Sequence, residues 1–213
     1  IVTKARFMLI IDNFRGHSYA GVTLTGKNYF GSIYRPDCEC GAAGHWCPQS
    51  LHPFITVHDV DGLSGNLMGS YTPLVDYLGH PDLAGKAIAF LMDGMLGGTQ
   101  QNRDPPVRFA SDPFNGGWSC SIFGSQDPVA LDSVAFDFLR NEPNVPLAHN
   151  GCVDNYLHEA ALVPHPPSGT EYNPTGHKSL SESLGCHEHW DSAKTKRYSR
   201  NLGTGSGIEL VRV

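Results

Sequence analysis

The sequence predicts an α/β fold with a mainly parallel sheet, flanking helices and one long cysteine-containing loop. Runs of strand length within 6–11 and 86–92 are hydrophobic almost throughout, which is typical of strands covered on both faces. Segments with helical periodicity separate these runs, and such alternation is typical of parallel sheets. For 213 residues of ordinary composition, we expect a single domain over 1–213.

Strands are expected at 6–11, 86–92 and 118–124, and the stretch "GIELVRV" is a candidate last strand. Residues 19–30 fit either a strand or a helix. Helical spacing of the apolar residues behind Ser18, a plausible N-cap, favours the helix.

Capping residues and prolines mark the predicted helix starts. Thr72 and Pro73 begin a short helix that continues into "LVDYLG". Asp127 and Pro128 begin the clearest helix, whose apolar positions follow the helical period. A further helix is expected at about 153–162.

Composition excludes several classes of partner. The net charge is −6 and the basic residues are scattered, so we expect no nucleic-acid partner. No apolar run approaches the roughly 20 residues that span a bilayer. The sequence contains no Walker loop, so we expect no nucleotide cofactor.

The chain starts at Ile1 with a strand close behind, which we interpret as a processed or truncated product without its N-terminal part. The sequence does not indicate an oligomeric state.

The region 31–53 is rich in Pro, Gly and Cys and is expected to form an ordered loop excursion. It holds three of the six cysteines, Cys38, Cys40 and Cys47. Disulfides in an exported protein, secreted or periplasmic, explain such a cluster best. A metal site that also uses His45 stays open, although C-x-C is not the usual zinc hook.

The other three cysteines are Cys120, Cys152 and Cys186. We expect Cys152 and Cys186 to form a long-range disulfide.

Polar side chains follow each predicted strand in chain order: Asp12, Asp93, and the pair Ser125 and Asp127. Ligands gather outside the carboxyl ends of parallel strands, so we expect these side chains to share one crevice. Ser125 and Asp127 would bind substrate there. Each aspartate also has a structural interpretation as a turn residue or helix cap, which is the stronger one for Asp127.

The stretch "GCHEHWDS" places two histidines two positions apart. In an extended segment, His187 and His189 would face the same side and could bind one divalent cation, zinc or calcium. A further ligand would come from Asp93, Asp12, His17 or His158. We expect Asp93 and Asp12 to take part, and for His158 a surface or capping role is favoured. A polar loop beside a disulfide explains the two histidines equally well.

The stretch "GHSYAG" has features of a nucleophile elbow, a tight strand-to-helix turn that presents a serine. Ser18 would be the nucleophile of a serine hydrolase, with Asp93 or Asp127 and then His187 or His189 completing the triad. Ala20 departs from the motif, which has glycine at this position.

Three segments, "GHSYAGVTLTGKNYFGSI", "AIAFLMDGML" and "SIFGSQDPVALDSVAFDFL", together resemble the uncharacterised prokaryotic family known as domain of unknown function 362. The matching positions are His17, Lys27, Asn28, Gly31, Asp93, Gly94, Ser125, Asp127, Pro128 and Asp132. The resemblance covers nearly the whole chain and implies an α/β domain, without an established activity. Many relatives carry cysteine clusters for iron–sulfur centres, but their C-x2-C runs are absent here, so we expect no iron–sulfur cluster.

The resemblance implies that His17, Lys27 and Asn28 line the crevice with Asp93. His17 would be the acid/base, and Lys27 and Asn28 would stabilise charge. The leading hypothesis is an exported metal-dependent hydrolase or lyase acting on a small anionic or carbohydrate substrate. The alternatives are a serine hydrolase and a non-catalytic extracellular binding or structural protein.

Overall fold

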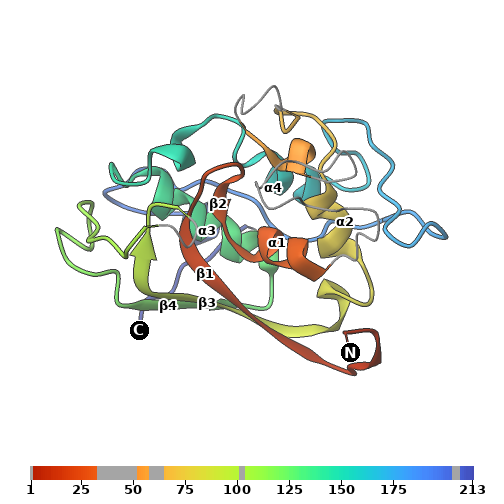
Figure 1. Ribbon diagram of the computed structural model, residues 1–213, viewed down its shortest axis with the longest axis horizontal. Helices are drawn as coiled ribbons and strands as arrows, with labels where there is room; N and C mark the ends of the chain where they lie inside the picture. The colour runs from red at the N-terminus through yellow and green to blue at the C-terminus, as the bar shows by residue number, and fades with distance from the viewer. Residues whose placement is uncertain (1, 33–51, 58–64, 101–103, 203–206) are drawn as a thin grey trace, which may run out of the picture.

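The computed structural model describes residues 2–32, 52–57, 65–100, 104–202 and 207–213. They form a sheet of strand order β2-β1-β3-β4, with β1 at Met8–His17, β2 at Gly21–Thr23, β3 at Ala87–Gly98 and β4 at Ser121–Ser125. The α-helices are α1 (Thr25–Asn28), α2 (Pro73–Gly79), α3 (Pro128–Arg140) and α4 (Asn155–Ala161), and they lie on one side of the sheet (Figure 1). Short 3-10 turns occupy Val2–Lys4, Tyr29–Ser32, His52–Ile55, Ala84–Lys86, Pro146–His149 and Ser199–Leu202.

The α/β class is confirmed, but the expectation of a mainly parallel sheet is wrong. Among the described strands, β1 and β3 are the one parallel pair, and β2 and β4 join them in the antiparallel direction. A parallel neighbour needs a crossover connection, usually a helix. The described residues between Gly98 and Ser121 contain no helix, so the chain returns as an antiparallel edge strand.

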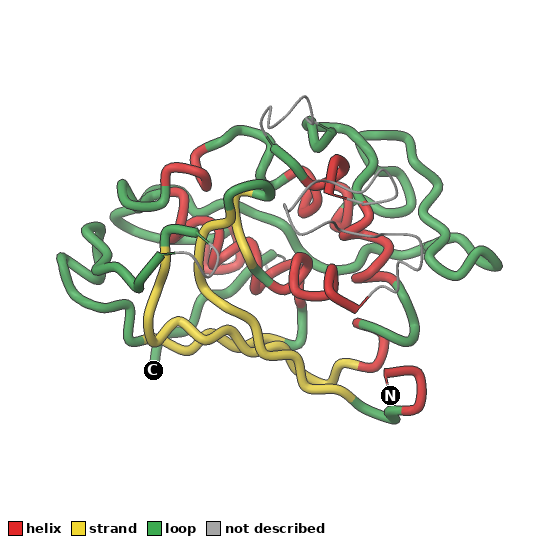
Figure 2. The backbone as a smooth tube through the Cα atoms, viewed as in Figure 1, coloured by secondary structure: helices red, strands yellow, loops and turns green. Residues whose placement is uncertain are grey.

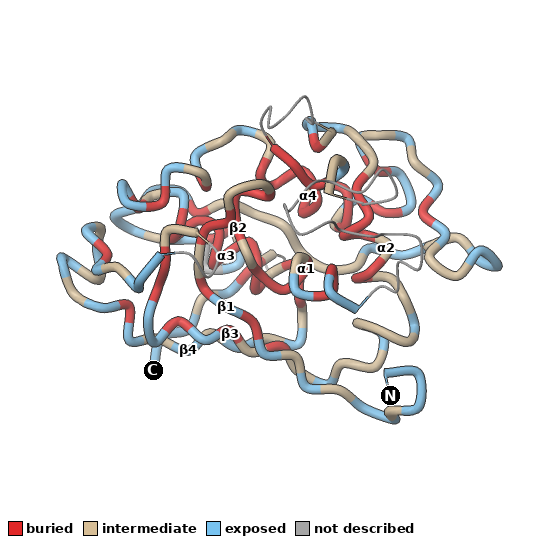
Figure 3. The backbone as a smooth tube through the Cα atoms, in the orientation of Figure 1, coloured by how far each residue is buried: buried red, intermediate tan, exposed pale blue. Residues whose placement is uncertain are grey.

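The sheet is covered on one face, whereas we expected both faces to be covered. Phe14, Phe90 and Met92 are at most 2% exposed and belong to the core beneath the helices. On the other face, Leu9 and Ile11 are 51% and 61% exposed. The strands are hydrophobic throughout because both faces are apolar, although one of them meets solvent, as the alternating burial along β1 and β3 shows (Figure 3).

Local capping signals are confirmed. The Thr72 hydroxyl accepts the N–H of Leu74 at the start of α2, and the Asp127 carboxylate accepts the N–H of Ala130 at the start of α3. Both helices have Pro at their first turn, where a missing N–H costs no hydrogen bond.

Other element predictions need correction. Residues 19–30 do not form one helix, because a turn, β2 and the four-residue α1 share this stretch. The described C-terminal residues 207–213 contain no strand. The first and second strands extend beyond their predicted ends, to His17 and Gly98. Most of the cysteine-rich region 31–53, with Cys38, Cys40 and Cys47, lies outside the described residues. Within the described chain, no helix has the length and apolarity needed to cross a membrane.

A segment without helix or strand runs from the end of α4 to Ser199 and passes along α3 (Figure 2). The backbone N–H of Cys186 donates to Asp127 at the start of α3, and that of Trp190 donates to Asp137 near its end. The Trp190 ring also meets the Phe138 ring edge-on, with centroids 5.0 Å apart. These contacts hold the two histidines of this segment against α3.

Candidate metal centre

Four side chains from two segments lie close together, and each offers one atom that could bind a metal ion. They are Asp154 and His158 from α4 and the residue before it, and His187 and His189 from the segment along α3. One ligand atom of each lies within 4.8 Å of all the others. The predicted pairing of His187 and His189 on one side of an extended segment agrees with this arrangement, since their rings are 4.8 Å apart.

Three of the six separations between the ligand atoms are close to those around a tetrahedral ion, and all six are within 4.8 Å. Nε2 of His187 is 3.3 Å from Nε2 of His158. The Asp154 Oδ2 atom is 3.1 Å from Nε2 of His189 and 3.6 Å from Nε2 of His158. Ligand atoms about 2.0–2.1 Å from a tetrahedral zinc lie roughly 3.3–3.4 Å from one another. Three edges of the cluster are therefore close to zinc geometry.

Ser133 of α3 fixes the orientation of His187. The Ser133 hydroxyl donates to the carbonyl of Val129, one helical turn earlier, at 2.7 Å. Its oxygen then accepts from Nδ1 of His187, 2.8 Å away. With the proton on Nδ1, the lone pair of Nε2 points into the cluster, as a metal ligand requires.

Asp137, one turn after Ser133, holds His189 in the same way. Its Oδ1 atom is 2.8 Å from Nδ1 of His189, and a carboxylate can only accept. The other oxygen accepts from the Trp190 N–H and from the Tyr198 hydroxyl, which anchors the carboxylate. A carboxylate behind a metal-binding imidazole is a recurring feature of metal sites, because it fixes the tautomer and increases ligand basicity.

Burial and neighbouring charge set the protonation of the cluster. Burial, and then the charges of the two other histidines, lower the pKa of His187 to about 3, so its ring is neutral near pH 7. Hydrogen bonds to Asp137 and Asp154 raise the pKa of His189 to about 9. Burial acts to raise the pKa of Asp154, but the hydrogen bonds from His158 and His189 hold it below the ordinary value. A metal bound here would displace the Nε2 proton of His189.

Asp93 and Asp12 are not part of the cluster, contrary to expectation. In the parallel register Asp12 lies opposite Met92, and Asp93 lies opposite Asn13. Successive side chains alternate between faces, so the Asp12 carboxylate points under the helices and Asp93 points to the exposed face. Both lie within their strands, because the strands extend beyond the predicted ends, and Asp93 accepts the N–H of Met95.

Asp12 has a different partner, the buried carboxylate of Asp132. Oδ2 of Asp12 accepts from the Thr25 hydroxyl, while Asp132 accepts the N–H groups of Thr25 and Gly26. Burial, and then the charge of Asp132, raise the pKa of Asp12 to about 7. Burial likewise raises the pKa of Asp132 to about 6. This pair anchors the start of α1 to β1 and α3.

The predicted catalytic residues gather at and before α1, and none of them contributes a ligand atom to the four-residue cluster. Nδ1 of His17 accepts the N–H groups of Tyr19 and Ala20, and burial followed by the Lys27 charge lowers the His17 pKa to about 3. The Lys27 ammonium lies 4.8 Å from the centre of the Phe30 ring. The Asn28 side chain reaches the carbonyl of Ile11, at 3.5 Å.

The Ser18 position is not a nucleophile elbow. It lies in the turn between the antiparallel strands β1 and β2, not between a strand and a helix. The Nε2 atoms of the two expected histidines, which would have to face the serine, face other groups: that of His187 lies 3.3 Å from His158 and that of His189 lies 3.1 Å from Asp154.

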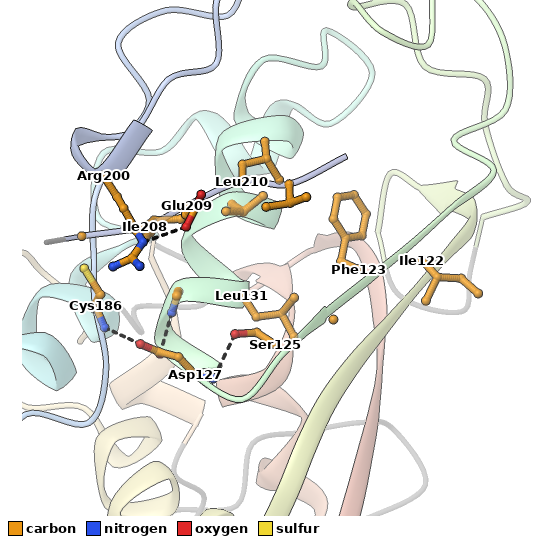
Figure 4. Close-up of a pocket in the computed structure, with 15 residues that line it drawn as sticks. Ile122, Phe123, Ser125, Asp127, Leu131, Cys186, Arg200, Ile208, Glu209 and Leu210 are labelled. Carbon is orange, nitrogen blue, oxygen red and sulfur yellow. Dashed lines mark hydrogen bonds and ion pairs between the residues drawn. The ribbon is translucent and has the colours of Figure 1, made fainter. Parts of the chain in front are cut away.

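Ser125 and Asp127 do line a pocket, of about 460 Å³, at the start of α3 (Figure 4). Its other walls include Cys186 and the C-terminal residues around Glu209. The Asp127 carboxylate is already bonded to the N–H groups of Ala130 and Cys186, and Ser125 accepts the N–H of Asp127. Both side chains thus have structural roles at this helix start.

The described cysteines Cys120, Cys152 and Cys186 are free thiols, so the expected Cys152–Cys186 disulfide is not formed in this structure. Hydrogen bonds hold both backbones, from the Cys152 N–H to Asn150 and from the Cys186 N–H to Asp127.

Sequence reasoning missed Asp154 and underrated His158. A surface or capping role was expected for His158, whereas Asp154 lies four residues before it, one helical turn away on the same face, and the two side chains meet. Ser133 and Asp137 carry a similar signal, since they are polar residues four apart in a helix whose other buried residues, apart from Asp132, are apolar.

Comparison with known proteins found no match among protein-family models, curated proteins or solved structures. The resemblance to the domain of unknown function 362 family therefore stays a prediction.

Proposed function

We propose that this chain binds one divalent metal ion through Asp154, His158, His187 and His189, and that the ion serves a hydrolase- or lyase-type reaction on a small anionic substrate. The convergence of four ligand atoms within 4.8 Å of one another, with three separations of 3.1–3.6 Å, carries the proposal. Three imidazoles and a carboxylate suit zinc. Calcium prefers oxygen ligands and fits less well.

The hydrogen bonds behind the two histidines support the same proposal. In His187 and His189, the Nδ1 atom is hydrogen-bonded to an acceptor on α3, so the Nε2 atom of each ring faces the cluster. Without a cation, Nε2 of His158 and Nε2 of His187 are 3.3 Å apart, so one of them must be protonated and donate a hydrogen bond to the other. A cation among the four ligands satisfies all the lone pairs at once.

A metal in this position would polarise a substrate oxygen or lower the pKa of bound water. The three histidines are of intermediate burial, so solvent and a small substrate can reach the cluster from their side, while Asp154 is buried. His17, Lys27 and Asn28 lie near α1 and are not assigned to this reaction.

A structural role is the second candidate. The stretch between α4 and Ser199 has no helix or strand, and a metal would join it to the start of α4. Structural zinc sites are closed by four protein ligands, so the catalytic role requires the ion to take water or substrate as a fifth ligand.

The proposal has three further parts: membership of the domain of unknown function 362 family, an exported location, and a small-molecule or carbohydrate substrate. Their support is the three sequence segments that resemble the family and the six cysteines.

Metal analysis of the purified protein tests the proposal. After incubation with Zn²⁺ and desalting, we expect about one zinc per chain in the wild type and much less in His187→Ala and His158→Ala. His177→Ala, which removes an exposed histidine outside the cluster, is the matched control and should keep its zinc. Equal zinc in all variants would reject the site.

The same samples separate the two candidate roles. For a catalytic ion, chelation abolishes hydrolysis of p-nitrophenyl phosphate or acetate and lowers the melting temperature little. For a structural ion, chelation lowers the melting temperature strongly and neither ester is cleaved at any metal content.

A further inference from the structure

Arg140, the last residue of α3, is the cationic side chain in contact with the candidate metal centre. One of its terminal nitrogens, NH1, lies 3.3 Å from Nδ1 and 3.4 Å from Nε2 of His189. Its Nε atom is 3.8 Å from the Asp137 carboxylate, and the guanidinium lies over the Phe136 ring, 5.7 Å from its centre. These contacts hold the charged group beside the imidazole, while its side chain stays 39% exposed.

The distances place Arg140 within reach of anything bound to the metal. A zinc ion about 2.0–2.1 Å from Nε2 of His189 can be at most about 5.5 Å from the NH1 nitrogen. NH1 is almost equally far from Nδ1 and Nε2, so it lies beside the ring and the distance from zinc to NH1 is shorter than this limit. An oxygen that binds zinc at about 2.0 Å and accepts from NH1 at about 2.9 Å bridges the two when they are no more than about 4.9 Å apart.

Charge balance also favours an anion at this position. The two negative charges of Asp137 and Asp154 balance the two positive charges of the metal ion. These two carboxylates therefore do not also neutralise the positive charge of the Arg140 guanidinium. A guanidinium and a metal ion this close repel each other unless an anion lies between them. The second terminal nitrogen, NH2, has no hydrogen bond to the described residues, so the guanidinium retains donors for a ligand.

We propose that Arg140 and the metal together bind an oxyanion group of the substrate, a carboxylate or a phosphate. The inference rests on the proposed function, because the metal supplies one of the two contacts. Guanidinium donors match the oxygen geometry of both groups. This assigns Arg140 as a residue that determines specificity for anionic substrates.

Calorimetric titration of the zinc-loaded protein with inorganic phosphate, and separately with acetate, tests the inference at constant ionic strength. We expect Arg140→Gln to weaken binding of the preferred anion at least about tenfold, the scale of one lost charge-assisted contact. Its zinc content should equal that of the wild type. Arg108→Gln is the matched control, since Arg108 is another exposed arginine that lies over an aromatic ring, that of Trp118.

Each outcome is decisive. Loss of anion affinity in Arg140→Gln alone, with zinc retained, supports the inference, and the preferred anion tells phosphate from carboxylate. Zinc binding without anion binding, equal affinity in Arg140→Gln and the wild type, or equal affinity with and without zinc overturns it and leaves the metal centre standing. A wild-type protein that binds no zinc overturns both proposals.

Discussion

Ser133 and Asp137 decide whether the histidines of the cluster can act as ligands. Each binds an Nδ1 atom and so directs an Nε2 lone pair inward. The two residues are one turn apart on α3, which matches the two-residue spacing of His187 and His189 in the extended segment. Neither contact could be predicted from sequence, because the partners are more than 50 positions apart, whereas the Asp154–His158 pair could have been found from helical spacing alone.

Removing the acceptor behind His187 should weaken metal binding without removing a ligand. We expect Ser133→Ala to reduce zinc affinity about 10-fold or more, the usual effect of losing an outer-shell partner. A competition titration with a chromophoric chelator measures it. Ser121→Ala, which removes a serine of β4 outside the cluster, should leave zinc affinity unchanged. Equal affinities in both variants would show that Ser133 does not orient His187.

Burial of the Asp12 and Asp132 carboxylates should make stability depend on pH. Their native pKa values, about 7 and about 6, exceed the unfolded value, so the native state retains protons that the unfolded state releases. The stability from this pair is present below about pH 4 and is lost as the pH rises through about 7.

Asp12→Asn should therefore gain stability relative to the wild type between pH 4 and pH 8, by an amount on the order of a few kcal/mol. Urea unfolding at several pH values measures this difference. Asp82→Asn is a control of opposite sign, because a hydrogen bond from Lys86 lowers the pKa of Asp82. A constant difference between Asp12→Asn and the wild type would contradict the assignment.

At the scale of elements, α3 organises the structure because its two ends and its buried face hold different segments. Its start was predictable from Asp127 and Pro128, since capping chemistry is local in sequence. Strand direction was not predictable in this way, because it depends on where the chain returns after Gly98 and not on the composition of the strand.

The cap of α3 should contribute measurably to stability. Asp127→Ala removes the acceptor of the Ala130 and Cys186 N–H groups, so we expect a loss of about 1–2 kcal/mol in the free energy of unfolding. Asp127→Asn keeps an acceptor oxygen at the cap and should lose clearly less. Chemical denaturation of both variants makes the comparison, and equal losses would show that the cap geometry is unimportant.

At the scale of the whole molecule, the helices and the candidate centre lie on one face of the sheet, while the other face is apolar and exposed. This asymmetry explains why hydrophobic runs alone predicted a sheet covered on both sides. The α/β class follows from such runs, but the number of covered faces does not.

The asymmetry predicts different costs for the two faces. Met92→Ala, on the buried face, should destabilise the protein by about 2–5 kcal/mol. Ile11→Ala, on the exposed face, should cost less than about 1 kcal/mol. Thermal or urea unfolding compares them, and a cost at Ile11 as large as that at Met92 would mean that the outer face is covered in solution.

Anomalous diffraction at the zinc edge, from crystals grown with Zn²⁺, tests the central claim most directly. We expect one strong peak about 2.0–2.2 Å from a carboxylate oxygen of Asp154 and from the Nε2 atoms of His158, His187 and His189. Crystals that show no peak among these four residues, with His189 still bridging Asp137 and Asp154, would contradict it.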